Sequence, residues 1–307
     1  MRNAFIEELI VQAKQDSSIF LIVGDLGYGV VEEFASKYPN QFLNAGVAEQ
    51  NMMGMAAGIA SAGYKVFVYS IANFPTFRCF EQLRNDVCYH DFNVTIVAVG
   101  AGLSYGSLGY SHHAIEDIAV LRALPGLKIM SPADPVETRQ ALQYALKNEG
   151  PKYLRLGKNG EPKLFSEQDS RFPNASSFGS PNAKIKLISS GAILNEALEA
   201  RNLLEVNDIY AQVINVPLLK PFTLELDLMR NAEFVVSIEE HSIAGGLGTL
   251  VSEYVLQNDL LVKVLCLGLP DEVQSLIGSQ AFLREHYGIS GSKIANRIRA
   301  FLTGHAE

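Results

Sequence analysis

Three short loops of the sequence carry side chains that could do acid–base chemistry. Asp25 lies in GDLGYG, Glu49 lies in NAGVAEQNM, and the adjacent pair His112 and His113 lies in GSLGYSHHAIED. Each loop follows a short apolar run that is typical of a buried parallel strand. Because ligands bind at the carboxyl ends of the strands in such sheets, we expect the three loops to converge on one site.

Glu49 has two interpretations. As an isolated residue, it is a carboxylate at the first turn of a helix, where free N–H groups and the helix dipole favour negative charge. Within the apolar stretch VAEQNMMGM, desolvation would instead favour the protonated carboxyl, which can share its proton with a ring nitrogen of a ligand. The residues around Glu49 leave both interpretations open.

The histidines and a nearby aromatic cluster also have two interpretations each. A histidine in a loop most often makes a structural hydrogen bond, yet an adjacent pair in a glycine-rich loop could transfer protons or contact a substrate. Because no third ligand lies at a suitable spacing, we predict no metal site. Phe74, Phe77 and Phe80 surround Arg78, which predicts core packing, or stacking of Phe74 or Phe77 on a flat heterocycle.

The glycine-rich loops match no complete nucleotide-binding motif. The sequence contains neither GxGxxG nor GxxxxGK followed by Ser or Thr, so GAGLSYGSLG gives only a weak indication of phosphate binding. The stretch SIEEHSIAGGLG is interpreted as a joint between a strand and a helix, in which the glycines permit tight packing.

Strand-like and helix-like segments alternate along the whole chain, which predicts an α/β fold. We expect two domains, each a mostly parallel sheet flanked by helices, at 1–157 and 184–307. The polar segment 158–183, rich in Pro, Ser, Asn and Asp, is expected to be a linker. Within the first domain, 77–90 has the apolar spacing of one helix.

Composition limits the partners of the chain. Its 307 residues are 48% hydrophobic and only 19% charged, so either the core is large or part of the surface is buried against other chains. The net charge of −8, without any basic cluster, predicts no nucleic-acid or anionic membrane partner, and no apolar run is long enough to span a membrane. Three widely spaced cysteines and the absence of a signal-peptide pattern indicate a cytoplasmic protein.

Several long motifs together resemble the thiamine diphosphate enzymes of the transketolase family. They are NAGVAEQNMMGMAAG, FEQLRNDV, SHHAIEDIAVLRALPGLKIMSPADPVET and EEHSIAGGLG, in this order along the chain. The resemblance covers essentially the whole sequence and implies a pyrimidine-binding domain followed by the family's C-terminal domain. The family's preceding domain binds the diphosphate and magnesium through a GDG…N motif, and this sequence contains no GDG.

The resemblance therefore implies the smaller subunit of a split transketolase. Such a subunit would act with a separate N-terminal subunit that binds the diphosphate together with Mg²⁺ or Ca²⁺, as an α2β2 assembly. The implied reaction transfers a two-carbon ketol unit from a ketose or its phosphate to an aldose. Alternatives are a 1-deoxyxylulose 5-phosphate synthase, the beta subunit of a 2-oxo acid dehydrogenase, or a non-catalytic subunit that only binds a partner.

The resemblance also assigns cofactor-binding roles. Glu49 matches the catalytic glutamate that hydrogen-bonds the aminopyrimidine ring of thiamine diphosphate and helps to activate its thiazolium carbon. Asp25 matches an aspartate near the pyrimidine end of the cofactor. Phe74 matches an aromatic residue at the pyrimidine ring, Phe77 is a second candidate for that contact, and Ile71 falls at the position of the family's main stacking phenylalanine.

The expected substrate-binding residues come from both ends of the first domain. His112 matches the active-site histidine that contacts the substrate, and His113 is placed beside it. Arg155 and Arg2 match positions that bind the phosphate of a sugar phosphate, for which the guanidinium fork is suited.

Two positions depart from the family pattern. Leu108 stands where the family has an aspartate that contacts the donor sugar, and Gly100 corresponds to a histidine that helps to bind phosphate. These departures imply that cofactor activation is retained while the substrate is atypical.

Overall fold

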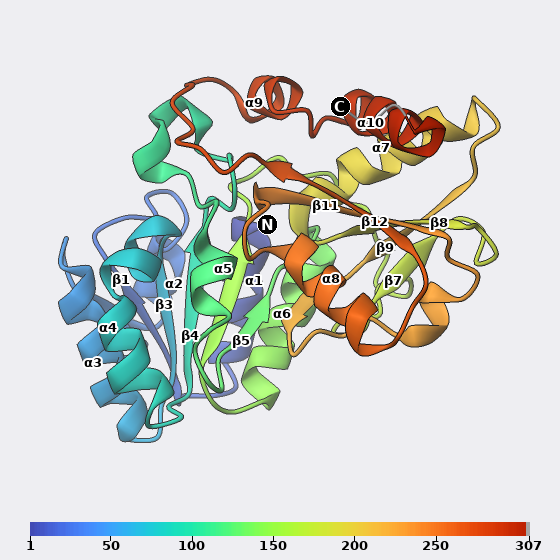
Figure 1. Cartoon of the computed structure of the whole chain (residues 1–307). Coiled ribbons are helices and arrows are strands. Elements are labelled where there is room, and N and C mark those ends of the chain that lie inside the picture. Colours follow the sequence, from blue (N-terminus) through green and yellow to red (C-terminus); the bar gives the residue numbers. More distant parts are fainter. Residues whose placement is uncertain (305–307) are drawn as a thin grey trace.

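Two sheets organise the chain, and the computed structural model describes them over residues 1–304 (Figure 1). The first sheet has seven strands in the order β10-β5-β6-β4-β3-β1-β2, and the second has five in the order β12-β11-β8-β9-β7. All pairings are parallel except β10 with β5 and β7 with β9. The prediction of two α/β domains with mostly parallel sheets is confirmed.

The strands are short, and most of them are buried on both faces. Those of the first sheet are β1 (Ile19–Val23), β2 (Phe42–Asn44), β3 (Lys65–Ile71), β4 (Val94–Val99), β5 (Lys128–Met130), β6 (Lys152–Leu156) and β10 (Leu218–Lys220). Those of the second sheet are β7 (Ser176–Phe178), β8 (Ile185–Ser189), β9 (Ala211–Asn215), β11 (Phe234–Ser242) and β12 (Lys263–Leu269). Continuous apolar runs such as IFLIV in β1 fit this burial, because helices cover both faces of a parallel sheet.

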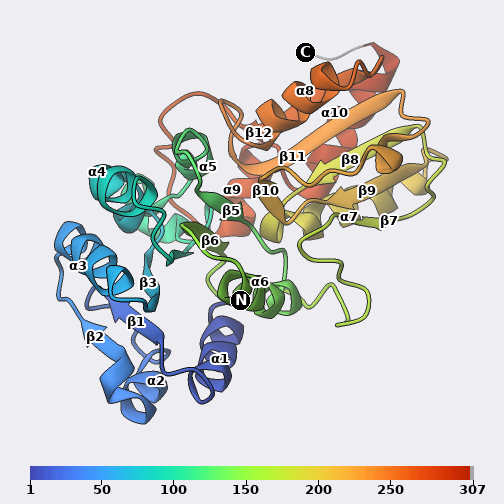
Figure 2. The same cartoon turned by 90° about the horizontal axis from the view of Figure 1, so that it is seen from below.

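Helices flank both sheets. Those of the first domain are α1 (Arg2–Ala13), α2 (Glu32–Lys37), α3 (Glu49–Ser61), α4 (Phe80–Gln82), α5 (Asp117–Leu121) and α6 (Pro135–Lys147). Those of the second are α7 (Leu194–Glu205), α8 (Leu247–Gln257), α9 (Gln280–His286) and α10 (Gly291–Thr303). Figure 2 shows α1 and α6 together on one face of the first sheet, with α3 and α4 on the other. No helix within residues 1–304 combines the length and hydropathy of a membrane span.

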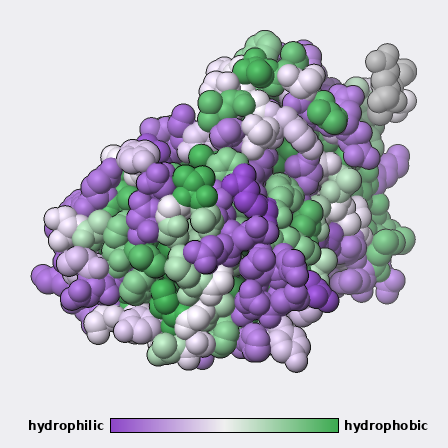
Figure 3. All heavy atoms as spheres, turned by 90° about the vertical axis from the view of Figure 1, so that its left-hand side faces the viewer, coloured by the Kyte–Doolittle hydropathy of each residue, from purple (hydrophilic) through white to green (hydrophobic). Residues whose placement is uncertain are grey.

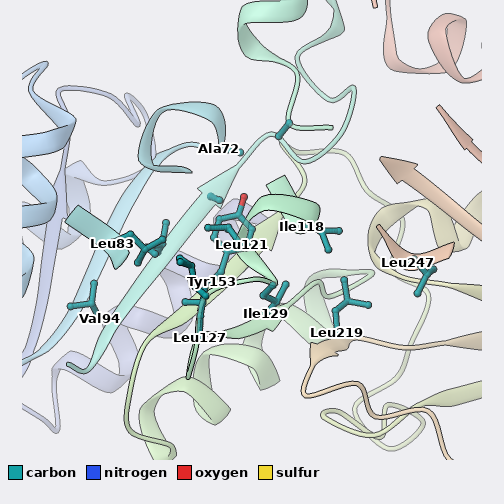
Figure 4. Close-up of a cluster of buried hydrophobic side chains, with 14 of the residues drawn as sticks. Ala72, Leu83, Val94, Ile118, Leu121, Leu127, Ile129, Tyr153, Leu219 and Leu247 are labelled. Carbon is teal, nitrogen blue, oxygen red and sulfur yellow. The ribbon is translucent and has the colours of Figure 1, made fainter. Parts of the chain in front are cut away.

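One apolar cluster joins the two domains. It extends from Val94 on β4, through Leu121 on α5 and Tyr153 on β6, to Leu219 on β10 and Leu247 on α8 (Figure 4). All five side chains are at most 1% exposed. The second domain therefore packs directly against the elements that carry the loops of the first.

The structure departs from the predicted domain boundaries in two places. β10 comes from the second segment but pairs with β5 and completes the first sheet. The expected linker 158–183 contains β7, which is the edge strand of the second sheet. It is also anchored to the first domain, because the Asp134 carboxylate accepts hydrogen bonds from the backbone N–H groups of Leu164 and Phe165, both within 2.9 Å.

The segment predicted as one helix over 77–90 is not a continuous α-helix. A π-helical turn at Phe74–Arg78 overlaps its start, and the single turn α4 and a second π-helical turn at Leu83–Cys88 follow. A π-helical turn rotates the following side chains relative to an α-helix, and such turns are frequent at functional sites.

Candidate active site

The predicted convergence of loops occurs at the carboxyl edge of the first sheet. Asp25 follows β1, Glu49 begins the helix after β2, Phe74 follows β3, and His112 lies in the loop after β4 (Figure 1). The strands β2, β1, β3 and β4 are consecutive neighbours in the sheet, so their loops lie side by side.

Glu49 is almost fully buried but has a charged partner. It is 3% exposed, and its Oε2 accepts a 2.6 Å hydrogen bond from Nη1 of Arg78. The Arg78 guanidinium also lies over the ring of Phe74, at 4.8 Å from the ring centroid. The stretch VAEQNMMGM predicted apolar surroundings for this carboxylate. The structure adds a charged partner, the Arg78 guanidinium. Sequence reasoning noted Arg78 among phenylalanines but did not pair it with Glu49.

Asp25 is exposed and joins the ends of two strands. Its backbone has the left-handed φ of 53°, and its N–H donates to Oδ1 of Asn44 at 3.0 Å. The Asn44 amide donates in return to Oδ1 of Asp25, also at 3.0 Å. This reciprocal pair of hydrogen bonds fixes the loop after β1 against the end of β2. It uses only Oδ1 of the Asp25 carboxylate.

His112 is half-buried and lies against Phe74. The two ring centroids are 5.5 Å apart in an edge-to-face arrangement, and Tyr105 approaches the imidazole from another side at 6.5 Å. The Asn73 amide donates to the backbone carbonyl of Ser111 at 2.9 Å, which connects the loop of His112 to the loop of Phe74. The predicted catalytic histidine and the predicted cofactor-binding phenylalanine are therefore in contact.

Arg2 and Lys158 surround Tyr105 at this edge. The Lys158 ammonium lies 5.0 Å from the Tyr105 ring centroid, and Nε of Arg2 is buried without a hydrogen-bond partner. Burial raises the pKa of the Tyr105 hydroxyl, while the nearby Arg2 charge opposes this shift. The ring of Tyr105 occupies the space beside Gly100, where an added Cβ would come within 2.2 Å of it.

Two predicted substrate-binding residues face the interior instead. His113 is 1% exposed, neither of its ring nitrogens has a hydrogen-bond partner, and burial lowers its pKa. Arg155 is 4% exposed, and its Nε donates to Asp117 Oδ2 at 2.8 Å. Burial alone would raise the pKa of Asp117, but the adjacent Arg155 guanidinium helps to lower it. The structure thus gives Arg155 a buried ion pair with Asp117, and its contact with a substrate phosphate stays a prediction.

The remaining predicted positions lie around this edge with different exposure. Ile71 is half-buried at the end of β3, and Phe77 is 38% exposed. Leu108 is 51% exposed, in a short 3₁₀ turn at Gly106–Leu108. Within residues 1–304, no three His, Cys, Asp or Glu side chains lie close enough to hold a metal ion.

Glu240, which sequence reasoning did not single out, holds the His112 loop from the second domain. Its Oε1 accepts from the backbone N–H of Leu103 at 2.6 Å and from the Gln280 amide at 2.7 Å. Its Oε2 accepts from Nε of Arg284 at 2.6 Å. Gly102 passes so close that an added Cβ would lie 2.6 Å from Oε1 of Glu240. α9 lies beside the same loop (Figure 1).

The neighbouring Glu239 has a purely structural environment. Its carboxylate accepts from the backbone N–H groups of Leu247 and Gly248, at 2.6 and 2.9 Å, at the start of α8. A Cβ on Gly246 would come within 2.0 Å of the same carboxylate. The interpretation of SIEEHSIAGGLG as a tightly packed joint between a strand and a helix agrees with this geometry.

Comparison with known proteins identifies the family. Residues 1–162 match the family model described as the transketolase pyrimidine-binding domain, and residues 178–294 match the transketolase C-terminal domain. The chain belongs to the transketolase family. The resemblance found in the sequence motifs is thereby confirmed.

Several relatives match the chain over nearly their whole length. A putative transketolase C-terminal section of Methanocaldococcus jannaschii is 36% identical, over 97% of this chain and 95% of that protein. One of the subunits of an apulose-4-phosphate transketolase of Actinobacillus succinogenes is 31% identical, over 96% of each chain. A solved structure described as a split-gene transketolase in an inactive β4 tetramer superposes with a TM-score of 0.87, at 34% identity, over 98% of this chain and 97% of that one.

Transketolases depend on thiamine diphosphate, and this chain offers groups that fit the pyrimidine half of that cofactor. A buried carboxylate at Glu49 and a ring at Phe74 lie together at the sheet edge. Two buried polar atoms nearby, Asn73 Oδ1 and Arg2 Nε, have no protein partner. Unpartnered buried polar atoms are costly unless a ligand or water satisfies them, so their presence agrees with a ligand site.

Proposed function

We propose that this chain is the smaller subunit of a split transketolase, which transfers a two-carbon ketol unit from a ketose or ketose phosphate to an aldose. The contiguity of Glu49, Phe74 and His112 at one sheet edge is the observation that supports this proposal most directly. A merely structural acid at the first turn of a helix would not require the chain of contacts that runs from Glu49 through Arg78 and Phe74 to His112.

The side chains of this edge would hold the pyrimidine half of the cofactor. When bound, thiamine diphosphate supplies the nucleophilic carbon and the electron sink for cleavage of a carbon–carbon bond. Glu49 would hydrogen-bond a ring nitrogen and move a proton there, while Phe74 would flank the ring, with Ile71 and Phe77 next to it. Asp25 would lie near the same end, where its carboxylate is exposed.

The substrate would lie between the cofactor and the His112 loop. His112 is half-buried and lies against Phe74, so it would hold or transfer a proton at a substrate hydroxyl or carbonyl oxygen. Arg2 is the better candidate for a substrate phosphate, because Nε of Arg2 has no protein partner whereas Arg155 pairs with Asp117. His113 is buried beneath this loop, so it would support the loop and would not contact the substrate.

A second subunit would bind the diphosphate and Mg²⁺ or Ca²⁺, in an α2β2 assembly located in the cytoplasm. Residues 1–304 contain no cluster of metal ligands, and relatives of similar length are named as subunits or sections. Figure 3 shows apolar residues interspersed with polar ones on the face of the molecule that includes α3 and α4. Val47 and Phe77, at 75% and 38% exposure, contribute apolar surface that a partner could cover.

An atypical sugar phosphate is the favoured substrate class. Leu108 and Gly100 replace polar residues of the family pattern, and Tyr105 fills the space beside Gly100. A relative of similar length is named for apulose 4-phosphate, which supports a substrate outside the common pentose phosphates. Ordinary transketolase rates with xylulose 5-phosphate and ribose 5-phosphate would exclude this part of the proposal.

The experiment reconstitutes the chain with the transketolase N-terminal subunit of its own source and compares wild type with Glu49→Gln. Loss of an acid–base group lowers the rate on the order of 10²-fold or more, so we expect that loss with unchanged assembly. Undiminished activity of the variant would indicate a non-catalytic subunit. Release of CO₂ from pyruvate would instead indicate a synthase or a 2-oxo acid decarboxylase. Arg84→Gln, at an exposed residue of the π-helical turn Leu83–Cys88, serves as the control for removing a surface charge.

A further inference from the structure

Arg78 makes both contacts that the proposed function assigns to the cofactor's pyrimidine ring. Its Nη1 donates to Glu49 Oε2 at 2.6 Å, and its guanidinium lies over the Phe74 ring at 4.8 Å. A guanidinium is flat, carries hydrogen-bond donors in its plane and stacks on aromatic faces. An aminopyrimidine shares these three properties, so the two groups compete for the same place.

Resting on the proposed function, we propose that Arg78 is a positioning residue that occupies the pyrimidine place and must leave Glu49 when the cofactor binds. It holds the Glu49 carboxylate in position within the chain that has no cofactor. On binding, the hydrogen bond from Arg78 would break, and the Glu49 carboxylate, after taking up a proton from solvent, would share that proton with the ring nitrogen of the cofactor at the same oxygen.

The burial of the two partners permits this exchange. The Glu49 side chain is 3% exposed, whereas the Arg78 side chain is 48% exposed in the chain alone and can turn away from Glu49. A buried carboxylate without a partner is strongly unfavourable, so something must pair with Glu49 before the cofactor does. The pair of Arg155 and Asp117 is different, because both side chains are buried, at 5% and 0% exposure.

The local backbone explains how Arg78 reaches this position. Arg78 is the last residue of the π-helical turn Phe74–Arg78, directly after β3 and packed against the start of α3. The extra residue of a π turn changes the direction in which Arg78 points. Phe74 begins the same turn, so one five-residue segment supplies both the ring and the cation that lies over it.

Two properties distinguish a displaceable residue from a merely structural one. Removing Arg78 leaves Glu49 buried without its partner, which lowers the stability of the chain alone. The same change removes a competitor for Glu49, which strengthens cofactor binding. Substitution of a residue that only supports the fold would weaken both the stability of the chain and cofactor binding. Substitution of a residue that binds the cofactor directly would weaken cofactor binding.

The test measures thiamine diphosphate binding with Mg²⁺ by calorimetry in the complex with the N-terminal subunit, and urea unfolding of the chain alone. For Arg78→Gln we expect about tenfold tighter binding, about 1.4 kcal/mol, together with a lower urea midpoint. Arg78→Lys keeps the positive charge but lacks the planar guanidinium. It should restore the wild-type urea midpoint, while thiamine diphosphate still binds more tightly than to wild type. In a Glu49→Gln background the change at Arg78 should no longer affect binding.

The control is Arg84→Gln, because Arg84 is exposed and donates to its neighbour Asn85 rather than to Glu49. It should change neither measurement. Unchanged or weaker cofactor binding by Arg78→Gln, with normal binding by wild type, overturns the role of Arg78 alone. An assembled wild-type complex that does not bind thiamine diphosphate overturns the proposed function as well.

Discussion

Replacing Glu240 with glutamine tests whether the second domain holds the loop that carries His112. The substitution keeps the shape of the side chain but removes one of its two acceptor oxygens and its charge. Glu240 is 5% exposed and accepts hydrogen bonds from Leu103, Gln280 and Arg284, so water cannot replace the lost acceptor.

The expected magnitude follows from these contacts. Breaking a buried ion pair by removing one partner costs about 3–5 kcal/mol, and a glutamine that retains one acceptor oxygen places the loss near the lower end. A loss of about 3 kcal/mol in the free energy of local opening corresponds to roughly 10²-fold faster exchange, since about 1.4 kcal/mol is a factor of ten.

The assay is amide hydrogen exchange of residues 100–114, followed by mass spectrometry. The reporters are the N–H of Leu103, bonded to Glu240, and the mutual backbone bonds between Gly102 and Ala114. Glu253→Gln is the matched control, because Glu253 also pairs across the domain boundary, with Arg122, but is 48% exposed. An exposed pair contributes about 1 kcal/mol at most, so the control should leave this loop unaffected. Equal exchange of the loop in both variants refutes the reasoning.

Three further perturbations test other parts of the site and fold. Gly100→Ala should lower the free energy of unfolding by about 2–5 kcal/mol in urea, because the new Cβ meets a ring at 2.2 Å and φ is +98°. Gly46→Ala, with a φ of +72° and open space, should lose only about 1–2 kcal/mol. Burial raises the pKa of Glu137 to about 7, so folding takes up a proton between about pH 4.5 and 7, and this contribution to stability falls as pH rises through that window. Glu137→Gln should remove that fall, and a variant with the wild-type pH dependence between pH 5 and 8 would contradict the assignment. His112→Ala should lower kcat/KM of the reconstituted enzyme about 10²-fold or more, whereas His90→Ala, an exposed histidine, should not.

Local sequence patterns predicted the parts of the site that depend on strand order. Short apolar runs followed by loops place Asp25, Glu49 and His112 at one edge, because a parallel sheet brings the ends of its strands together. This argument needs only the type of each element and the polarity of the loop after it. It therefore predicted which loops meet, without predicting which side chains touch.

The same patterns could not predict contacts that depend on the direction of a side chain. Arg155 lies within β6, close to its carboxyl end, yet its side chain points into the protein toward Asp117. Arg78 reaches Glu49 because a π-helical turn replaces the predicted α-helix, and helical periodicity contains no indication of such a turn. Glu240 of the second domain binds Leu103 of the first, and a sequence pattern within one domain does not predict its contacts with the other.

The strand β10 has a consequence for how such an enzyme can be divided among genes. A chain cut between the two domains would lose β10 and leave the hydrogen-bonding edge of β5 open. An open edge strand invites pairing with other chains and aggregation. The cut chain would also expose the apolar cluster that Leu219 and Leu247 complete. Division of the chain at the polar segment is therefore expected to destabilise both halves, although the composition of that segment is typical of a linker.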